Sequence, residues 1–170
     1  MPVEVRDITD IRKLNDRPLT ETAFTDVSVN LTKKAPDAAE YKYEMFAYIV
    51  TAVNHLGVES GPSPYVLTIP SDPAHVLCRE RGETAELKWN ANPEEKIAGY
   101  HVYKLGKGHW DIVRVTEQPV KATTFTHQVG KGTSRFWVVA VDALGQEGEP
   151  SSPVWFNQRS KGFFEGEWHQ

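Results

Sequence analysis

Hydrophobic and polar residues alternate along short stretches of this chain, which is the pattern of half-buried β-strands. In residues 84–89, Ala85, Leu87 and Trp89 fall on one side and charged residues fall on the other. Residues 135–141 alternate in the same way and are rich in the aromatic and β-branched types that favour strands. About seven short strands, separated by turn-forming Gly, Pro, Asn and Asp, predict an antiparallel β-sandwich without helices in the second half of the chain.

The chain also contains an internal repeat. Residues 10–25 recur at 111–126, an offset of 101 positions, and residues 52–63 recur at 140–151, an offset of 88 positions. A repeat at a fixed period predicts a repeated architecture, and it does not by itself predict an activity.

The two copies differ in what precedes them. Residues 72–108 form a full lead-in to the second copy, whereas the first copy has only a few residues before its matching segment. The repeat therefore predicts a partial domain at residues 1–70, incomplete on its N-terminal side, and a complete domain at residues 71–157. Residues 158–170 are left as a C-terminal tail.

Four motifs in the second copy resemble those of the fibronectin type III family: Leu87-x-Trp89, Tyr100-x-Val102-Tyr103, Thr123-x-Phe125-Thr126 and Phe136-x-Val138-x-Ala140-Val141-Asp142. The resemblance covers residues 72–156 in full and the later part of a repeat in residues 8–69. It implies tandem fibronectin type III-like (immunoglobulin-like) β-sandwiches, each with strands A, B and E in one sheet and C, C′, F and G in the other. One departure is Ser134, which stands where the family commonly has a tyrosine.

The composition of the chain argues against several kinds of binding partner. The net charge is −4 and the chain has no long basic run, so we expect no nucleic-acid partner. No apolar stretch is long enough to insert into a membrane, and we expect no signal peptide within this chain. Cys78 is the single cysteine, which excludes an intramolecular disulfide. The family resemblance implies an extracellular or cell-surface location.

No catalytic constellation emerges from the sequence. The six histidines are scattered and no pair has the spacing of metal ligands. The serines lie in Pro- and Gly-rich turns without the pattern of a nucleophile elbow. We therefore expect no catalytic residues, no metal site and no cofactor.

Aromatic residues give the main candidate site. If Phe136 faces the core, alternation sends Trp137 to the opposite face, and the same rule sends His101, Tyr103 and Trp155 outward. Their strands are neighbours in the family, so these side chains are expected to share one outer face, and such a patch usually marks a contact. Four readings stay open: packing by the tail or the preceding domain, packing by a neighbouring domain of a longer protein, glycan binding, and simple exposure.

The C-terminal tail carries three aromatic residues within a short span, Phe163, Phe164 and Trp168. A disordered end is normally poor in aromatics. We expect the tail to fold back over the protein surface and to bury at least one ring.

The partial domain raises the question of what completes it. Without strands A, B and most of C it would expose Phe24, Tyr48, Val50 and an open sheet edge. Three explanations remain: upstream strands of a larger protein or of a second polypeptide, a strand-exchanged dimer, and a patch made by residues 1–9 and the tail.

Together these patterns predict a non-catalytic structural or interaction module, a spacer or docking pair at the C-terminal end of a larger extracellular protein. The alternative is a carbohydrate-binding accessory module of a secreted polysaccharide-active enzyme, using Tyr103, Trp137 and Trp155.

Overall fold

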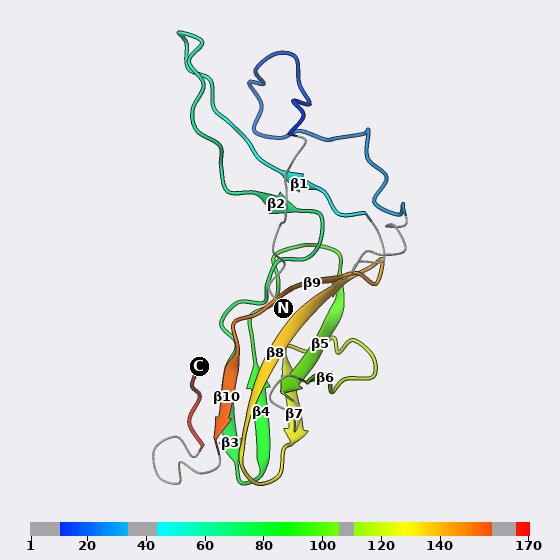
Figure 1. The fold of residues 1–170 in the computed structure, drawn as a ribbon, viewed down its shortest axis with the longest axis vertical. Coiled ribbons are helices and arrows are strands. Elements are labelled where there is room, and N and C mark those ends of the chain that lie inside the picture. The colour runs from blue at the N-terminus through cyan, green and yellow to red at the C-terminus, as the bar shows by residue number, and fades with distance from the viewer. Residues whose placement is uncertain (1–10, 34–43, 106–110, 158–165) are drawn as a thin grey trace. The chain divides into compact units, whose positions relative to one another are not determined.

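The computed structural model describes residues 11–33, 44–105, 111–157 and 166–170. It shows an all-β protein (Figure 1). The described residues form strands and turns, and none of them is helical. They fall into two compact units, one from Ile69 to Gln170 and one from Val3 to Thr68. We call these the sandwich unit and the N-terminal unit, and each is described by itself.

The sandwich unit consists of two antiparallel sheets (Figure 1). One sheet has the order β3-β4-β7, and the other has the order β10-β8-β5-β6, with β9 also pairing with β8. These orders correspond to A-B-E and G-F-C-C′, which is the arrangement that the family resemblance implies. The bounds are β3 Leu77–Arg81, β4 Thr84–Lys88, β5 Ile97–Leu105, β6 Ile112–Arg114, β7 Thr124–Gln128, β8 Thr133–Asp142, β9 Glu147–Pro150 and β10 Val154–Asn157.

The core lies between the two sheets and follows the alternation read from the sequence. Phe136, Val138 and Ala140 of β8 are fully buried, and Val102 of β5 is buried opposite Val138. Trp89 meets the ring of Tyr100 edge-on, with 5.3 Å between the ring centroids. Burying each large apolar side chain contributes about 1.5–3 kcal/mol to folding, so this layer stabilises the unit.

The family's tyrosine is replaced at one corner of the sandwich. Ser134 is buried, and its hydroxyl donates to the Leu105 carbonyl oxygen at 3.3 Å. A short side chain therefore makes a local bond between β8 and β5 at the place where the sequence lacks the tyrosine hydroxyl.

The sandwich unit begins with a proline-rich segment that packs on β9. Ile69, Pro70 and Pro73 are buried, and the Glu149 N–H donates to the Pro70 carbonyl oxygen at 3.1 Å. A Cβ atom on Gly148 would lie 2.2 Å from that oxygen. Only glycine allows the two backbones to approach this closely.

The N-terminal unit contains one strand pair, β1 (Ala47–Tyr48) with β2 (Val66–Leu67). Beyond this pair, the Val50 N–H donates to the Ser63 hydroxyl at 3.0 Å, as the Val138 N–H donates to the Ser151 hydroxyl at 3.0 Å in the sandwich unit. These residues are 88 positions apart, so the repeat in the sequence is also a repeat of hydrogen bonds.

The turn that follows is repeated as well. The Asn54 carboxamide oxygen accepts from the N–H groups of Leu56 and Val58 at 2.9 and 3.0 Å. Its counterpart Asp142 accepts from the N–H groups two and four residues further on, at 2.9 and 2.8 Å. Gly57 and Gly145 have φ angles of 78° and 76°, in the left-handed region that favours glycine.

Candidate functional site

The outer face of the β10-β8-β5 sheet carries the aromatic residues singled out by the sequence. Tyr103 on β5 and Trp137 on β8 are paired in register, and Trp155 on β10 is paired with Arg135 on β8. Because paired residues of a sheet point to the same side, these four side chains share one face. We call them the aromatic face. Trp155 is 44% exposed, and the other three are half-buried.

Arg135 holds the exposed ring of Trp155. Its guanidinium carbon lies 4.0 Å from the centroid of the Trp155 ring, which is a cation–π contact. The guanidinium therefore covers one side of the ring.

Tyr103 is fixed by a carboxylate. Its hydroxyl donates to Glu147 on β9, at 2.8 Å from Oε1 and 2.7 Å from Oε2. Burial, together with this hydrogen bond, raises the pKa of the Tyr103 hydroxyl far above its usual value, so it stays protonated and donating. Arg114 Nη1 lies 3.7 Å from Glu147 Oε1 and compensates part of its charge.

His101 does not belong to the exposed surface, which corrects the expectation from alternation. It points to the outer side of β5 but is only 5% exposed. Its Nδ1 lies 2.9 Å from the Thr116 hydroxyl, and its Nε2 lies 3.9 Å from Glu147 Oε1. The segment after β6 and strand β9 supply these groups and cover the ring. Burial, with the nearby charge of Arg114, lowers the pKa of His101.

The described part of the tail, residues 166–170, lies along β3 in the other sheet and not on the aromatic face. The His169 N–H donates to the Cys78 carbonyl oxygen at 2.9 Å, and the Cys78 N–H donates to the His169 carbonyl oxygen at 2.7 Å. Gly166 adds a bond from its N–H to the Glu80 carbonyl oxygen at 3.1 Å. The chain end thus pairs with the free edge of β3 through an isolated antiparallel bridge between His169 and Cys78. Phe163 and Phe164 lie outside the described residues.

Trp168 packs on the outer surface of this second sheet. Its ring centroid lies 4.5 Å from the guanidinium carbon of Arg79 and 4.3 Å from Lys88 Nζ. Two cations on neighbouring strands therefore hold this half-buried ring, while the rings of the aromatic face lie on the opposite side of the sandwich.

A buried carboxylate fixes both ends of the tail. Glu80 is 5% exposed, and its Oε1 accepts from the Asn157 N–H at 2.8 Å and lies 3.3 Å from His169 Nε2. Beside it, burial, with the Glu80 charge adding to the effect, raises the pKa of the Cys78 thiol to about 12. Since the thiolate is the reactive form, Cys78 is a packing residue and not a nucleophile.

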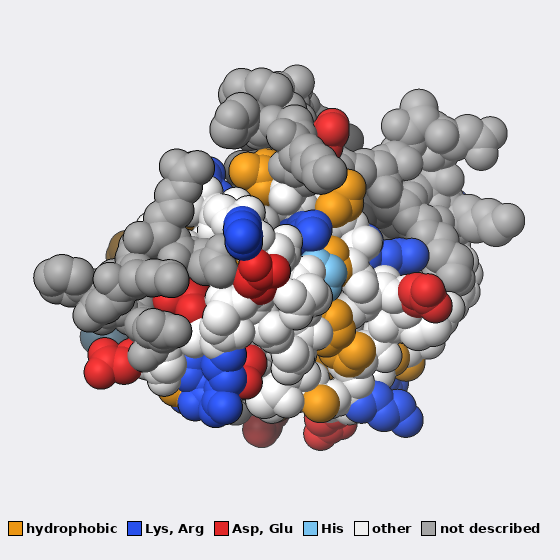
Figure 2. Space-filling view, turned by 90° about the horizontal axis from the view of Figure 1, so that it is seen from below, with side chains coloured by type: hydrophobic (Ala, Val, Ile, Leu, Met, Phe, Trp, Pro, Cys, Tyr) orange, Lys and Arg blue, Asp and Glu red, His pale blue; other side chains and the backbone are white. Residues whose placement is uncertain are grey.

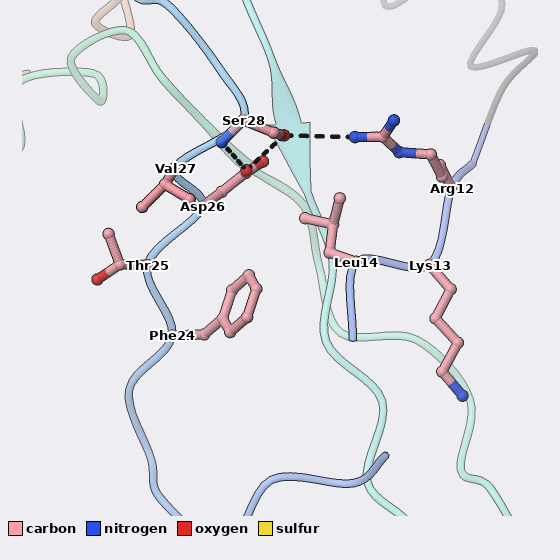
Figure 3. Close-up of a pocket in the computed structure, with 8 residues that line it drawn as sticks. All are labelled: Arg12, Lys13, Leu14, Phe24, Thr25, Asp26, Val27 and Ser28. Carbon is pink, nitrogen blue, oxygen red and sulfur yellow. Dashed lines mark hydrogen bonds between the residues drawn. The ribbon is translucent and has the colours of Figure 1, made fainter. Parts of the chain in front are cut away.

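The N-terminal unit contains an open hollow between two segments, residues 12–14 and 24–28. Leu14 and Phe24 face this space, and the Ser28 N–H and hydroxyl donate to Asp26 Oδ1 at 2.8 and 2.6 Å (Figure 3). The hydrogen bonds from Ser28 lower the pKa of Asp26. With its one carboxylate already engaged by Ser28, this arrangement offers apolar surface and no acid–base pair for catalysis.

In the part of the chain that the structure describes, no group of three or more His, Cys, Asp or Glu residues could hold a metal ion. None of the same residues forms a helix long and apolar enough to cross a membrane. On the face shown in Figure 2, Lys, Arg, Asp and Glu side chains surround a narrow run of hydrophobic ones.

The strand order and the buried core define the sandwich unit as a fibronectin type III-like β-sandwich. No family model and no curated protein matches the sequence.

Several solved structures are similar to about half of this chain. One described as "Myokine structure" is 21% identical over 52% of this chain and 96% of that chain, with a TM-score of 0.45. An Fn3-like protein from Clostridium thermocellum is 23% identical over 52% of this chain and 92% of that chain, with a TM-score of 0.45. The fibronectin type III domain of human fibronectin type III domain containing protein 3 is 19% identical over 56% of this chain and 95% of that chain, with a TM-score of 0.45.

Proposed function

We propose that the chain is a non-catalytic interaction module of a larger extracellular protein, and that the aromatic face docks against a neighbouring domain of that protein. The observation that supports this proposal is the exposed Trp155, held in place by Arg135. Trp, Tyr and Arg are the residues most enriched at the energetic centres of protein interfaces. A ring whose position is already fixed loses little conformational entropy when a partner covers it.

The surroundings of Trp155 also suit a docking surface. Tyr103 and Trp137 are half-buried beside it, and Tyr103 is fixed by Glu147. Arg114 and Glu147 supply charged groups at the border of the aromatic face. Protein interfaces commonly combine an aromatic centre with a polar rim of this kind.

Site-specific cross-linking tests the proposal. A photoreactive benzoylphenylalanine is placed at position 155, and a control carries it at Thr126, which is exposed on the outer side of β7 in the other sheet. In the cells that produce the protein, position 155 should cross-link to a defined peptide of the same polypeptide, whereas position 126 should not. Identical products from both positions, or none from position 155, would contradict the proposal.

The alternative is carbohydrate binding, and the exposed ring of Trp155 is the observation that favours it. Sugar rings stack on open aromatic faces, and Arg135 covers one side of this ring. Affinity electrophoresis in gels that contain soluble xylan, pectin or β-glucan decides between the two functions. We expect no retardation; retardation that disappears in Trp155→Ala would establish the alternative.

A further inference from the structure

The N-terminal unit repeats the strand pairing of the sandwich unit, and this repeat is independent of the aromatic face. The two strand pairs of the repeat have the same register: Tyr48 pairs with Val66, and 88 positions later Phe136 pairs with Val154. The N-terminal unit therefore contains the counterpart of the β8–β10 hairpin, which is the F–G hairpin of a sandwich.

The contact across the two layers is also repeated. In the sandwich unit, His127 of β7 meets the ring of Phe136 of β8, with 6.0 Å between the ring centroids. At the corresponding positions of the N-terminal unit, the Tyr48 hydroxyl donates to Asp26 Oδ2 at 3.1 Å. The segment around Asp26 and the β1–β2 pair thus face each other, as β7 and the β8–β10 pair do in the sandwich unit.

Burial is the property in which the two units differ. Val50 is 72% exposed, whereas its counterpart Val138 is fully buried. Phe24 is 52% exposed, whereas its counterpart Phe125 packs against the core. Among the described residues, every buried hydrophobic side chain lies at or after Ile69.

The sandwich unit shows what covers these positions when a copy is complete. Strand β5 pairs with β8 along its length, and strand β4 pairs with β7. On its other edge, β5 accepts a bond from the Val115 N–H to the Val102 carbonyl oxygen at 2.8 Å, and Tyr100 and Val120 exchange two bonds of 2.9 Å. Leu14 and Leu19 are the counterparts of Val115 and Val120 in the N-terminal unit, and they are 37% and 51% exposed.

We propose that the N-terminal unit is a strand acceptor, whose exposed apolar face takes up a three-stranded segment of the β3-β4-β5 kind. The third strand of that segment would insert between residues 47–53 and the segment around Leu14 and Leu19. An apolar residue of that strand would oppose Val50, as Val102 opposes Val138. Its second strand would pair with the segment around Phe24.

Connectivity identifies the source of the segment. In the sandwich unit, β5 leads along the chain to β6, and the counterpart of β6 begins at Ile11. The inserted segment is therefore polypeptide joined to this unit on the N-terminal side. Exchange of β3-β4-β5 between two copies of the chain would open one sandwich for each one it completes, so it would bury no additional apolar surface.

A graft within the full chain tests the proposal. A second copy of residues 72–105 is joined in front of Val5, which reproduces the spacing of the sandwich unit. Amide exchange of residues 47–53 should become slower by about tenfold or more than in the parent chain, because these N–H groups enter a paired and buried strand. The matched control carries Asp in place of Leu87 and Val102 in the grafted copy only, and should exchange as fast as the parent.

Three results would overturn the proposal. In the first, the amides of residues 47–53 exchange at the same rate in the graft and in its Asp control. In the second, the parent chain already protects these amides as well as the graft does. In the third, protection of these amides in the parent chain increases with protein concentration, which would show that a second copy of the chain covers the apolar face of the N-terminal unit. None of these outcomes bears on cross-linking from position 155, so the two proposals fail separately.

Discussion

Arg135 and Trp155 form a pair in which a charged side chain keeps an aromatic ring on an exposed sheet surface. Their neighbour Trp137 has a different role, because it is half-buried in the centre of the sheet, opposite Tyr103. Two tryptophans of one face are thus expected to differ in what they contribute to the stability of the fold.

Replacing Trp137 by Ala should destabilise the fold more than replacing Trp155. Trp137→Ala removes buried apolar area worth about 2 kcal/mol, and each 1 kcal/mol lowers Tm by roughly 4–8 °C in a domain of this size. Trp155→Ala removes mainly one surface cation–π contact, worth about 0.5 kcal/mol. Thermal melts followed by circular dichroism compare the two, and equal shifts would show that both rings are structural.

His127 lies at the end of the sandwich in a position that disfavours its charged form. Lys104 Nζ lies 3.1 Å from His127 Nε2, and the imidazole stacks on Phe125, with 6.4 Å between the centroids. Burial, with the charge of Lys104 adding to the effect, lowers the pKa of His127 from its ordinary 6.5. His101 is shifted in the same direction.

These shifts predict that the protein loses stability on mild acidification. When the pKa of a histidine is lower in the folded state than in the unfolded state, the unfolded state binds more protons than the folded state around and below pH 6.5. The free energy of unfolding therefore falls as the pH decreases through that value. Urea unfolding at pH 7.5 and at pH 5.0 should show this loss. His127→Gln should reduce the difference in the free energy of unfolding between the two pH values. The control His55→Gln, in the N-terminal unit, should retain this difference. A parent chain that is equally stable at both pH values would contradict the prediction.

At this scale the alternation in the sequence was sufficient to identify Phe136, Val138 and Val102 as core residues. For His101 it gave the correct outer side of the sheet but not the burial, because alternation reports only the side to which a residue points. Whether that side is covered depends on Thr116 and Glu147, which come from other elements of the chain.

Residues 166–170 cover part of the free edge of β3. Unpaired strand edges promote association between molecules. Here His169 pairs with Cys78, and Trp168 sits on Arg79 and Lys88.

Loss of residues 166–170 should both destabilise the protein and make it associate. Trp168→Ala removes two cation–π contacts of about 0.5 kcal/mol each, which corresponds to a Tm decrease of roughly 4–8 °C. Glu167→Ala, at an exposed neighbouring position, is the control and should melt like the parent. A chain that ends at residue 165 should show dimers or larger species by light scattering after size exclusion; a truncated chain that stays monomeric with an unchanged Tm would refute the role of these residues.

The sequence indicated that an aromatic tail would fold back, but not which edge it would join. That choice depends on Glu80 and on the two cations of β3 and β4, which stand 78 or more positions before Gly166–Gln170. Local patterns contain no information on such a distant pairing.

The sandwich unit contains its own core, because all the contacts described for it lie within residues 69–170. We therefore expect a chain of these residues alone to fold. All five tryptophans lie in this range, so their fluorescence reports on the sandwich unit. Urea unfolding followed by this fluorescence should give the same midpoint for residues 69–170 as for the full chain, and a clearly lower midpoint for the shorter chain would contradict the prediction.

The offset of 88 positions in the sequence is the same offset that relates the repeated hydrogen bonds at Val50 and Asn54. They did not say what covers Val50, because burial is a property of the assembled layers and not of a single strand pair.

The burial of Cys78 in the core has a practical consequence. Since this is the only cysteine and its side chain is fully buried among the core residues between the two sheets, a reagent such as iodoacetamide can modify it only while the sandwich is open around β3. The rate of alkylation in dilute buffer therefore reports how often the core opens at this strand. A single thiol thus serves as a natural probe of the rare opening of the sandwich.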